Sequence, residues 1–333
     1  MKRLIALMVV LVLVVGLAAC AQPAAPAPAA PTADAPAADA APAADGESFT
    51  VGYVINNFGD TFQNFIYQAM ESYATANGVT IINADAGEDA ATQLAEVENM
   101  LVMGVDALIV VPVDTAAMEP IINVVTDAGI PLVFVNRNPF AGREDQMPAG
   151  VYYVGSQEID AGIMQARHIG PMLDGQGGVA ILQGMLDNEG ALARTRGNEE
   201  ILAAEFPDIE ILAMQNADWQ VDLGMNVVEN WIIAYGDNLN AVLSNNDDMA
   251  IGAIRALQAA GREDVLVMGI DGNPNALDAI EAGELVGSVF QDAAGQGEGS
   301  LRMALNALNG VSQDSVLWIP FQLITADNVA NFR

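Results

Sequence analysis

Ten side chains that can bind a ligand or react come directly after short apolar runs of this sequence. They are Asp60, Phe62, Asn136, Arg137, Asn188, Arg194, Trp219, Asn246, Asp271 and Gln291. Carboxylates accept hydrogen bonds, guanidinium groups donate them, and amides do both. Such a set matches neighbouring hydroxyl groups, and an aromatic ring can cover the apolar C–H face of a sugar. The residue types therefore indicate a site for a polyhydroxylated ring.

Some of these residues also have a purely structural interpretation. Asn246 or the neighbouring Asp247 is a suitable N-cap for a helix that starts at Met249, because both side chains accept bonds from a first helical turn. Asp271 precedes a glycine and fits a turn, and Trp219 fits a hydrophobic core. The binding interpretation gains support from the shared location of the ten residues at the ends of apolar runs.

The sequence offers little for catalysis, metal ligation or nucleic-acid binding. A Ser-His-Asp triad would need His168, the only histidine, which we expect in a structural role on an amphipathic helix. Zinc is excluded for want of ligands. The stretch "GQGEG" at 295–299 lacks the register of a dinucleotide-binding loop and is predicted to be helical. The net charge of −32 argues against phosphate backbones. We expect no cofactor, no metal and no nucleic-acid partner.

Short β-rich runs alternate with amphipathic segments from Ser48 onward. The runs lie at 49–55, 79–84, 106–112, 130–136, 151–155, 178–184, 209–215, 240–246, 265–271 and 285–292. Helical spacing is clearest at 61–76, 90–103, 160–173, 191–204 and 249–260. The alternation predicts an α/β fold of two doubly wound lobes with parallel sheets. Ligands of such sheets lie at the carboxyl ends of the strands, where the ten side chains are expected.

The first 47 residues differ in composition from the rest. A basic head and the apolar stretch Leu4–Ala19 match a signal peptide over residues 1–19. Leu17–Cys20 resembles the lipobox of bacterial lipoproteins, which implies lipid transfer to Cys20, the only cysteine. The Ala/Pro-rich segment that follows cannot bury enough surface to fold. We therefore interpret 20–47 as a lipidated cysteine and a tether that holds an extracytoplasmic domain at a bacterial membrane.

Several longer stretches resemble the type I periplasmic binding proteins for monosaccharides, especially the galactose/glucose-binding and ribose-binding proteins. They are "IPLVFVNR", "YYVGSQEIDAGIMQARHI", "NNDDMAIGAIRAL" and "VMGIDGNPNALDAIEAGELVGSVFQD". The resemblance covers about Phe49 to Asn331 and implies two lobes joined by a three-segment hinge. It implies an N-terminal lobe of residues 48–156 and 292–318, and a C-terminal lobe of residues 157–291 and 319–333.

The resemblance also assigns binding roles to nine of the ten side chains. Asp60, Phe62 and Asn136 match a polar contact, a stacking ring and an amide of the galactose type. Arg137 and Gln291 are similar to the ribose type. Both types share an arginine, an amide, a carboxylate and a second stacking ring, which match Arg194, Asn246, Asp271 and Trp219.

Two departures leave the ligand open. The galactose type has a histidine and an aspartate just before the shared arginine, where this chain has Asn188 and Gly190. The galactose type also has a calcium loop rich in oxygen ligands, where this chain has Asp174 as its only acid. Calcium takes six to eight oxygen ligands, so we expect no calcium site.

Three functions are compatible with the sequence. The resemblance favours a monomeric receptor that captures a hexose or pentose by hinge closure and delivers it to the permease of an ABC importer, with no chemistry on the ligand. A sensor of the same fold would present a sugar, cyclitol or autoinducer to a chemoreceptor or sensor kinase. A carbohydrate-active enzyme would need a paired acid and base across the cleft.

The substitution Cys20→Ser tests the lipid anchor. We expect it to abolish acylation because the thiol is the acyl acceptor, so the protein should fractionate as soluble protein or remain as unprocessed precursor. Incorporation of radiolabelled palmitate into wild type and variant measures this. Equal labelling of the two proteins would contradict the anchor.

Overall fold

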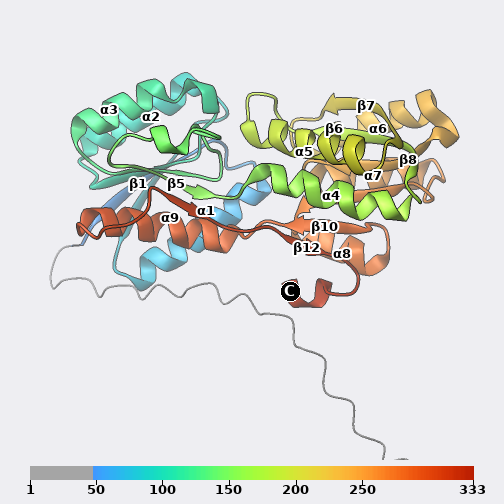
Figure 1. Cartoon of the computed structure of the whole chain (residues 1–333). Helices are drawn as coiled ribbons and strands as arrows, with labels where there is room; N and C mark the ends of the chain where they lie inside the picture. Colours follow the sequence, from blue (N-terminus) through green and yellow to red (C-terminus); the bar gives the residue numbers. More distant parts are fainter. Residues whose placement is uncertain (1–47) are drawn as a thin grey trace, which may run out of the picture. The chain divides into compact units, whose positions relative to one another are not determined.

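The computed structural model describes residues 48–333, which contain two six-stranded sheets (Figure 1). The first sheet consists of β1 (Thr50–Ile55), β2 (Thr80–Asp85), β3 (Ala107–Val110), β4 (Leu132–Val135), β5 (Val151–Gly155) and β11 (Val316–Trp318). The second consists of β6 (Gln176–Gln183), β7 (Asp208–Asn216), β8 (Leu239–Ser244), β9 (Leu266–Asp271), β10 (Gly287–Phe290) and β12 (Gln322–Ile324). Their orders are β11-β5-β4-β3-β1-β2 and β12-β10-β9-β8-β6-β7.

Nine α-helices within the described residues pack on these sheets. Those of the first sheet are α1 (Thr61–Ala76), α2 (Ala90–Met103), α3 (Glu119–Ala128) and α9 (Ala293–Leu308). Those of the second are α4 (Glu158–Met172), α5 (Glu189–Glu205), α6 (Val221–Tyr235), α7 (Asp247–Ala259) and α8 (Pro274–Ala282). Short 3-10 turns are η1 (Thr115–Ala117), η2 (Glu144–Gln146), η3 (Gly236–Asn238) and η4 (Val329–Phe332).

Successive residues of a strand enter cores on opposite faces of its sheet, as strand geometry requires. Tyr53 of β1 packs in the core with α1 and α9, whereas the next residue, Val54, packs in the core with α2 and α3. In the second sheet, Ile181 of β6 packs with α4 and α5, and Leu182 packs with α6, α7 and α8. Helices therefore cover both faces of each sheet, and the predicted fold of two doubly wound lobes is confirmed.

The chain passes between the two sheets three times through short crossovers. These are residues 156–157 between β5 and α4, 291–292 between β10 and α9, and 319–321 between β11 and β12. We name them the first, second and third crossover. The sequence pattern did not predict β11 and β12, because each has three residues and shows no period. β12 is also antiparallel to β10, whereas every other strand pair is parallel.

The predicted helices at 61–76 and 90–103 coincide with α1 and α2. Helices α4, α5 and α7 begin two residues earlier than predicted, at Glu158, Glu189 and Asp247. An acidic residue in the first turn of a helix is stabilised by the helix dipole and usually points to solvent. It therefore does not extend the apolar pattern from which the start of the helix was predicted. The glycine stretch 295–299 lies in α9, and His168 lies in α4, as expected.

Glycines allow close contact between helices that lie side by side. A methyl group at Gly252 of α7 would collide with the carbonyl oxygen of Val221 in α6, and one at Gly224 of α6 would lie 2.7 Å from the Met249 oxygen. The equivalent contact between α1 and α9 is at Gly297, opposite the Ile66 oxygen. Because these obstacles are backbone atoms, they cannot rotate away.

The substitution Gly252→Ala tests this packing. Overpacking should outweigh the better helix propensity of alanine, and we expect the free energy of unfolding to fall by about 1–2 kcal/mol. Gly299→Ala in α9 is the control, because its methyl group would meet only the side-chain ends of Leu317 at 2.9 Å and Val154 at 3.2 Å. Urea unfolding measures both variants, and an unchanged or higher stability of Gly252→Ala would contradict the contact.

Candidate functional site

All ten side chains singled out in the sequence line one cavity between the two lobes. Gln63, Glu158 and Gly190 complete its wall. The space between these side chains, counted together with its opening to solvent, amounts to about 400 Å³. The structure thus brings the predicted residues together, and their role in ligand binding stays a prediction.

Three of these residues are also the N-caps of helices that begin at the cavity. Asp60 Oδ1 accepts from the N–H of Gln63 in α1 at 3.1 Å, and Asn188 Oδ1 accepts from Gly190 in α5 at 2.8 Å. Asn246 Oδ1 accepts from Met249 in α7 at 2.9 Å. The structural interpretation of Asn246 is therefore right, and it coexists with a place in the cavity wall.

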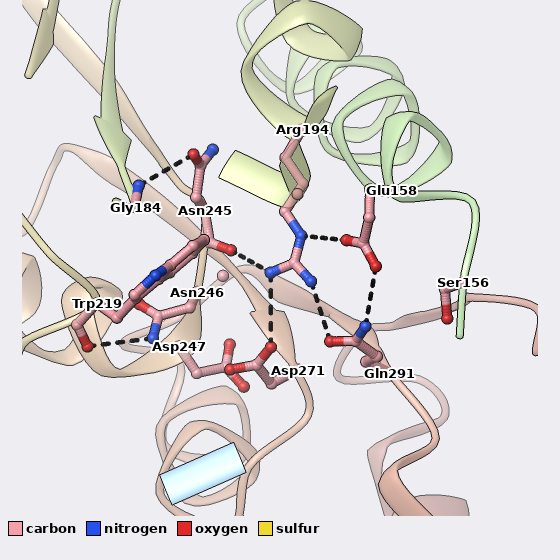
Figure 2. A network of polar contacts seen from close by, with 12 residues as sticks. Ser156, Glu158, Gly184, Arg194, Trp219, Asn245, Asn246, Asp247, Asp271 and Gln291 are labelled. Atoms are coloured by element: carbon pink, nitrogen blue, oxygen red, sulfur yellow. Dashed lines mark hydrogen bonds and ion pairs between the residues drawn. The ribbon is translucent and has the colours of Figure 1, made fainter. Parts of the chain in front are cut away.

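Arg194 of α5 lines the cavity, and its guanidinium group donates three hydrogen bonds to other parts of the protein (Figure 2). Its Nε donates to Glu158 Oε2 at 2.7 Å, its Nη1 to the Asn245 carbonyl at 2.7 Å, and its Nη2 to Gln291 Oε1 at 3.0 Å. Burial lowers the pKa of Arg194, but the carboxylates of Glu158 and Asp271 outweigh it, so the pKa lies above its ordinary value. Arg194 is therefore a permanently charged group fixed in the wall.

Asp271 is the last residue of β9 and has little protein contact for a buried carboxylate. It is 4% exposed, its Oδ1 lies 3.8 Å from Arg194 Nη1, and its Oδ2 accepts from Asn273 at 3.4 Å. Burial, followed by the charge of Asp247, holds its pKa well above the ordinary range. Its φ of 129° is also unusual for a residue other than glycine. A carboxyl group held in this way is poised for a ligand with hydrogen-bond donors.

Asp247 supports the loop that carries Asp271. It is fully buried, and it accepts from Ser288 Oγ at 2.7 Å and from the N–H groups of Gly272 at 2.7 Å and Asn273 at 2.8 Å. Burial raises its pKa to about 7, and these three bonds oppose the rise. The sequence interpretation of Asp247 as a helix cap is wrong, because Asn246 makes the cap bond and Asp247 reaches the next loop instead.

Asn136 is occupied by protein partners more fully than the sequence suggests. Its Oδ1 accepts from Gln63 Nε2 at 2.7 Å and its Nδ2 donates to Gln296 Oε1 at 3.1 Å. Its φ of 67° places it in the left-handed region. Gln63, which no sequence pattern marked, has a buried Oε1 without a hydrogen-bond partner and lines the cavity. Gln63 is therefore the freer acceptor of the two.

Arg137 follows β4, is 2% exposed and lines the cavity, where it binds the segment that follows β3. Its Nη1 donates to the carbonyl oxygens of Pro112 at 2.9 Å and Val113 at 3.2 Å, and lies 3.6 Å from Glu88 Oε2. Its Nε is buried without a partner. Within residues 48–333 this N–H has no acceptor, so it is a donor left free for a ligand.

The two aromatic residues come from different lobes. Phe62 is the second residue of α1 in the first lobe and is 8% exposed, and Trp219 follows β7 of the second lobe and is partly buried. The Trp219 indole packs so close to Gly184 that any side chain there would collide with it. Trp219 Nε1 has no hydrogen-bond partner. Both rings line the cavity, and Trp219 also packs against a hydrophobic core.

Direct hydrogen bonds join the two lobes around the cavity. Thr61 Oγ1 donates to Asp248 Oδ2 at 3.0 Å, and the Asn138 N–H donates to Glu189 Oε1 at 2.7 Å. Burial and the nearby Glu158 charge raise the pKa of Glu189 to about 8. Its second oxygen, Oε2, is buried without a partner. The two lobes are thus in direct contact beside the cavity.

Other expectations meet the structure as follows. Within residues 48–333, no group of three His, Cys, Asp or Glu side chains is placed to hold a metal ion. None of the helices in this part of the chain is long and apolar enough to cross a membrane. The signal peptide, the lipidated Cys20 and the tether lie outside the described residues.

Relatives in sequence carry related names. A family described as periplasmic binding protein domain matches residues 51–312. A putative rhizopine-binding protein of Rhizobium meliloti is 43% identical over 288 residues, which cover 85% of this chain and 92% of that protein. A xylitol-binding protein of Mycolicibacterium smegmatis is 34% identical over 289 residues, which cover 86% and 80% of the two chains.

Solved structures of the same kind superpose on the described residues. An ABC transporter solute-binding protein of Bacillus halodurans with bound myo-inositol has a TM-score of 0.80 and 38% identity, and the match covers 86% of this chain and 98% of that one. A Caulobacter myo-inositol binding protein, bound to myo-inositol, has a TM-score of 0.79 and 26% identity, with coverages of 86% and 96%. The likeness extends over both lobes.

The carboxyl group of Glu189 predicts a pH dependence of stability. Its pKa is about 8 in the folded protein against an ordinary 4.5, so the folded state binds more protons between these values. The free energy of unfolding should therefore fall as pH rises through this window. Glu189→Gln imitates the protonated group, and its stability relative to wild type should increase between pH 5 and pH 8.

Thermal unfolding at several pH values measures this effect. Glu200→Gln is the control, because Glu200 is 58% exposed and pairs only with Arg196 on the same helix at 3.6 Å. Parallel pH profiles for wild type and Glu189→Gln would show that this carboxyl group titrates normally.

Proposed function

We propose that this chain, which belongs to the periplasmic binding protein family, captures a monosaccharide or a cyclitol and delivers it to an ABC importer. The observation that carries the proposal is one cavity between the lobes, lined by two rings, two guanidinium groups, two carboxylates and four amides of the predicted set. This combination of side chains is what we expect of a sugar-binding member of that family. The named ligands of the relatives, xylitol and myo-inositol among them, support testing cyclitols and sugar alcohols beside hexoses and pentoses.

The free hydrogen-bonding atoms of the wall suit a ring with many hydroxyl groups. Gln63 Oε1, Arg137 Nε and Trp219 Nε1 are buried and have no partner within residues 48–333. An unpaired buried polar atom costs about 1–3 kcal/mol, so a bound hydroxyl that pairs with it stabilises the complex. Hydroxyls can serve both the two donors and the acceptor, because each hydroxyl donates and accepts. Asp60 and Asp271 supply further acceptors.

Closure of the lobes is the proposed means of capture. In this proposal, residues 48–156 and 292–318 move against residues 157–291 and 319–333. Phe62 and Trp219 belong to opposite lobes and both line the cavity, so a ring between them would contact both lobes at once. The hydrogen bonds from Thr61 to Asp248 and from Asn138 to Glu189 would then form on closing. A ligand that fits the closed cavity would shift the population toward that state.

The membrane role rests on the first residues and on the family. We propose that Cys20 anchors the protein through lipid and that the following tether lets the domain reach the permease. Release of the ligand unchanged is part of this proposal. Recovery of an isotope-labelled ligand in its original form after long incubation would distinguish a receptor from a carbohydrate-active enzyme.

A ligand screen with Asp271→Ala tests the proposed function. Tether-free wild type should be stabilised by a pentose, hexose or cyclitol, by about 2.7 kcal/mol at 100 times Kd. Asp271→Ala should weaken calorimetric affinity for the same compound about tenfold to hundredfold, because ligand hydroxyls would lose a buried hydrogen-bond acceptor, which costs about 1–3 kcal/mol. Asp264→Ala is the control, because Asp264 is 63% exposed and pairs with Arg262 outside the cavity.

Three results would count against parts of the proposal. No stabilisation by any compound of the screen would remove the sugar or cyclitol ligand. Equal affinity of wild type and Asp271→Ala would remove Asp271 from the contacts. Small-angle scattering should also show a smaller radius of gyration with saturating ligand, and an unchanged radius would contradict capture by closure.

A further inference from the structure

The guanidinium group of Arg194 contacts a residue within or directly beside each of the three crossovers. Glu158 directly follows the first crossover, and Gln291 opens the second. Phe321 belongs to the third crossover, and its ring centre lies 5.9 Å from Arg194 Cζ. The same guanidinium lies 5.7 Å from the Trp219 ring centre and lines the cavity. Arg194 therefore lines the cavity and also contacts residues within or directly beside the three crossovers.

Arg194, Glu158 and Gln291 form a closed ring of three hydrogen bonds, which Figure 2 shows. Arg194 Nε donates to Glu158 Oε2 at 2.7 Å, Gln291 Nε2 donates to Glu158 Oε1 at 3.1 Å, and Arg194 Nη2 donates to Gln291 Oε1 at 3.0 Å. All three residues are more than nine-tenths buried, at 6%, 7% and 1% exposed respectively for Arg194, Glu158 and Gln291. Every donor in the ring meets an acceptor.

We propose that Glu158 and Gln291 are positioning residues that couple the orientation of Arg194 to the crossovers, and hence to lobe closure. This inference rests on the proposed function. The three hydrogen bonds connect the guanidinium group directly to residues at the first two crossovers. A change in the backbone of these crossovers on opening therefore displaces Arg194 from its place in the ligand cavity. Ligand bound to Arg194 in turn favours the crossover geometry of the closed state.

The chemistry of the ring makes the proposal easy to test. In Glu158→Gln, one side-chain oxygen is replaced by an NH2 group. If the oxygen of the new amide accepts from Arg194, its nitrogen faces the amide nitrogen of Gln291. If Gln291 rotates to avoid this contact, its own nitrogen faces Arg194 Nη2. One donor must therefore face another donor in either arrangement.

Exchanging the two residues restores the ring. In the double variant Glu158→Gln with Gln291→Glu, the carboxylate at 291 accepts from both Arg194 and the amide at 158. The amide oxygen at 158 then accepts from Arg194 Nε. The overall charge is unchanged and every donor again meets an acceptor. A role of Glu158 as a direct ligand contact would not be restored by this exchange, because the carboxylate has moved to another position.

The first measurement is calorimetric affinity for myo-inositol as the probe. We expect Glu158→Gln to weaken binding about tenfold to hundredfold and the exchange variant to return to within about threefold of wild type. Glu200→Gln is the matched control. Glu200 pairs with Arg196 at 3.6 Å on the exposed face of α5, so its loss should leave affinity unchanged.

The second measurement needs no ligand and separates this inference from the proposed function. The chain has few arginines, so the Nε–H signals in nitrogen-15 spectra are sparse, and Arg194→Lys identifies the signal of Arg194. Its hydrogen exchange should be slow in wild type, at least about tenfold faster in Glu158→Gln, and slow again in the exchange variant.

The outcomes are distinct. Failure of wild type to bind any compound of the screen, with the expected exchange pattern, would overturn the proposed function and leave the ring in place without its coupling role. Equal Nε–H exchange in wild type and Glu158→Gln would overturn the ring. Restored exchange without restored affinity in the exchange variant would show that Glu158 or Gln291 contacts the ligand directly and would overturn the positioning role.

Discussion

A buried positive charge governs the arrangement of the cavity. Arg194 is 6% exposed, and a cation in that position is costly unless its N–H groups are paired. The partners are a carboxylate at the start of α4, a carbonyl at the end of β8 and an amide after β10. The ends of three elements must therefore meet at one point. This requirement fixes the second lobe's half of the cavity and ties it to the crossovers.

The site also shares its residues with the elements that carry it. Asp60, Asn188 and Asn246 each cap a helix with one oxygen while the side chain lines the cavity. Loss of an N-cap destabilises by about 0.5–2 kcal/mol, so substitutions at these positions change stability together with binding. Asp271 makes no cap bond, which makes it the cleaner position for measuring binding alone. Doubly wound sheets favour this sharing, because strands end and helices begin on the same side.

Carboxyl groups are concentrated and buried around the cavity, and burial raises the pKa of Glu158, Glu189, Asp247 and Asp271. Three of them are held by a specific contact: Glu158 by Arg194, Glu189 by the Asn138 amide, and Asp247 by Ser288 and two backbone N–H groups. Glu189 connects the lobes, so its protonation and lobe closure influence each other. Acidic residues of this chain thus form buried contacts around the cavity as well as lying on the surface.

The sequence by itself determined the doubly wound α/β fold and the places where ten binding side chains follow the strands. It did so because strand and helix periods are local, and because the carboxyl ends of parallel strands share an edge of the sheet. It also carried the family resemblance that the relatives confirm. Glu158 and Glu189 were not predicted as buried groups, and Asp247 was interpreted only as a helix cap, because an acidic residue in a first helical turn has the same local pattern whether it faces solvent or a buried partner.

Only the tertiary structure decided which of these atoms are occupied and which are free. Asn136 is bonded to Gln63 and Gln296, whereas Gln63 keeps an unpaired oxygen. Glu158 and Gln291 meet Arg194 across sequence separations of 36 and 97 residues. Contacts of this kind depend on how distant elements pack, which no local pattern contains. The short strands β11 and β12 and the third crossover between them are decided in the same way, by pairing with strands elsewhere in the chain.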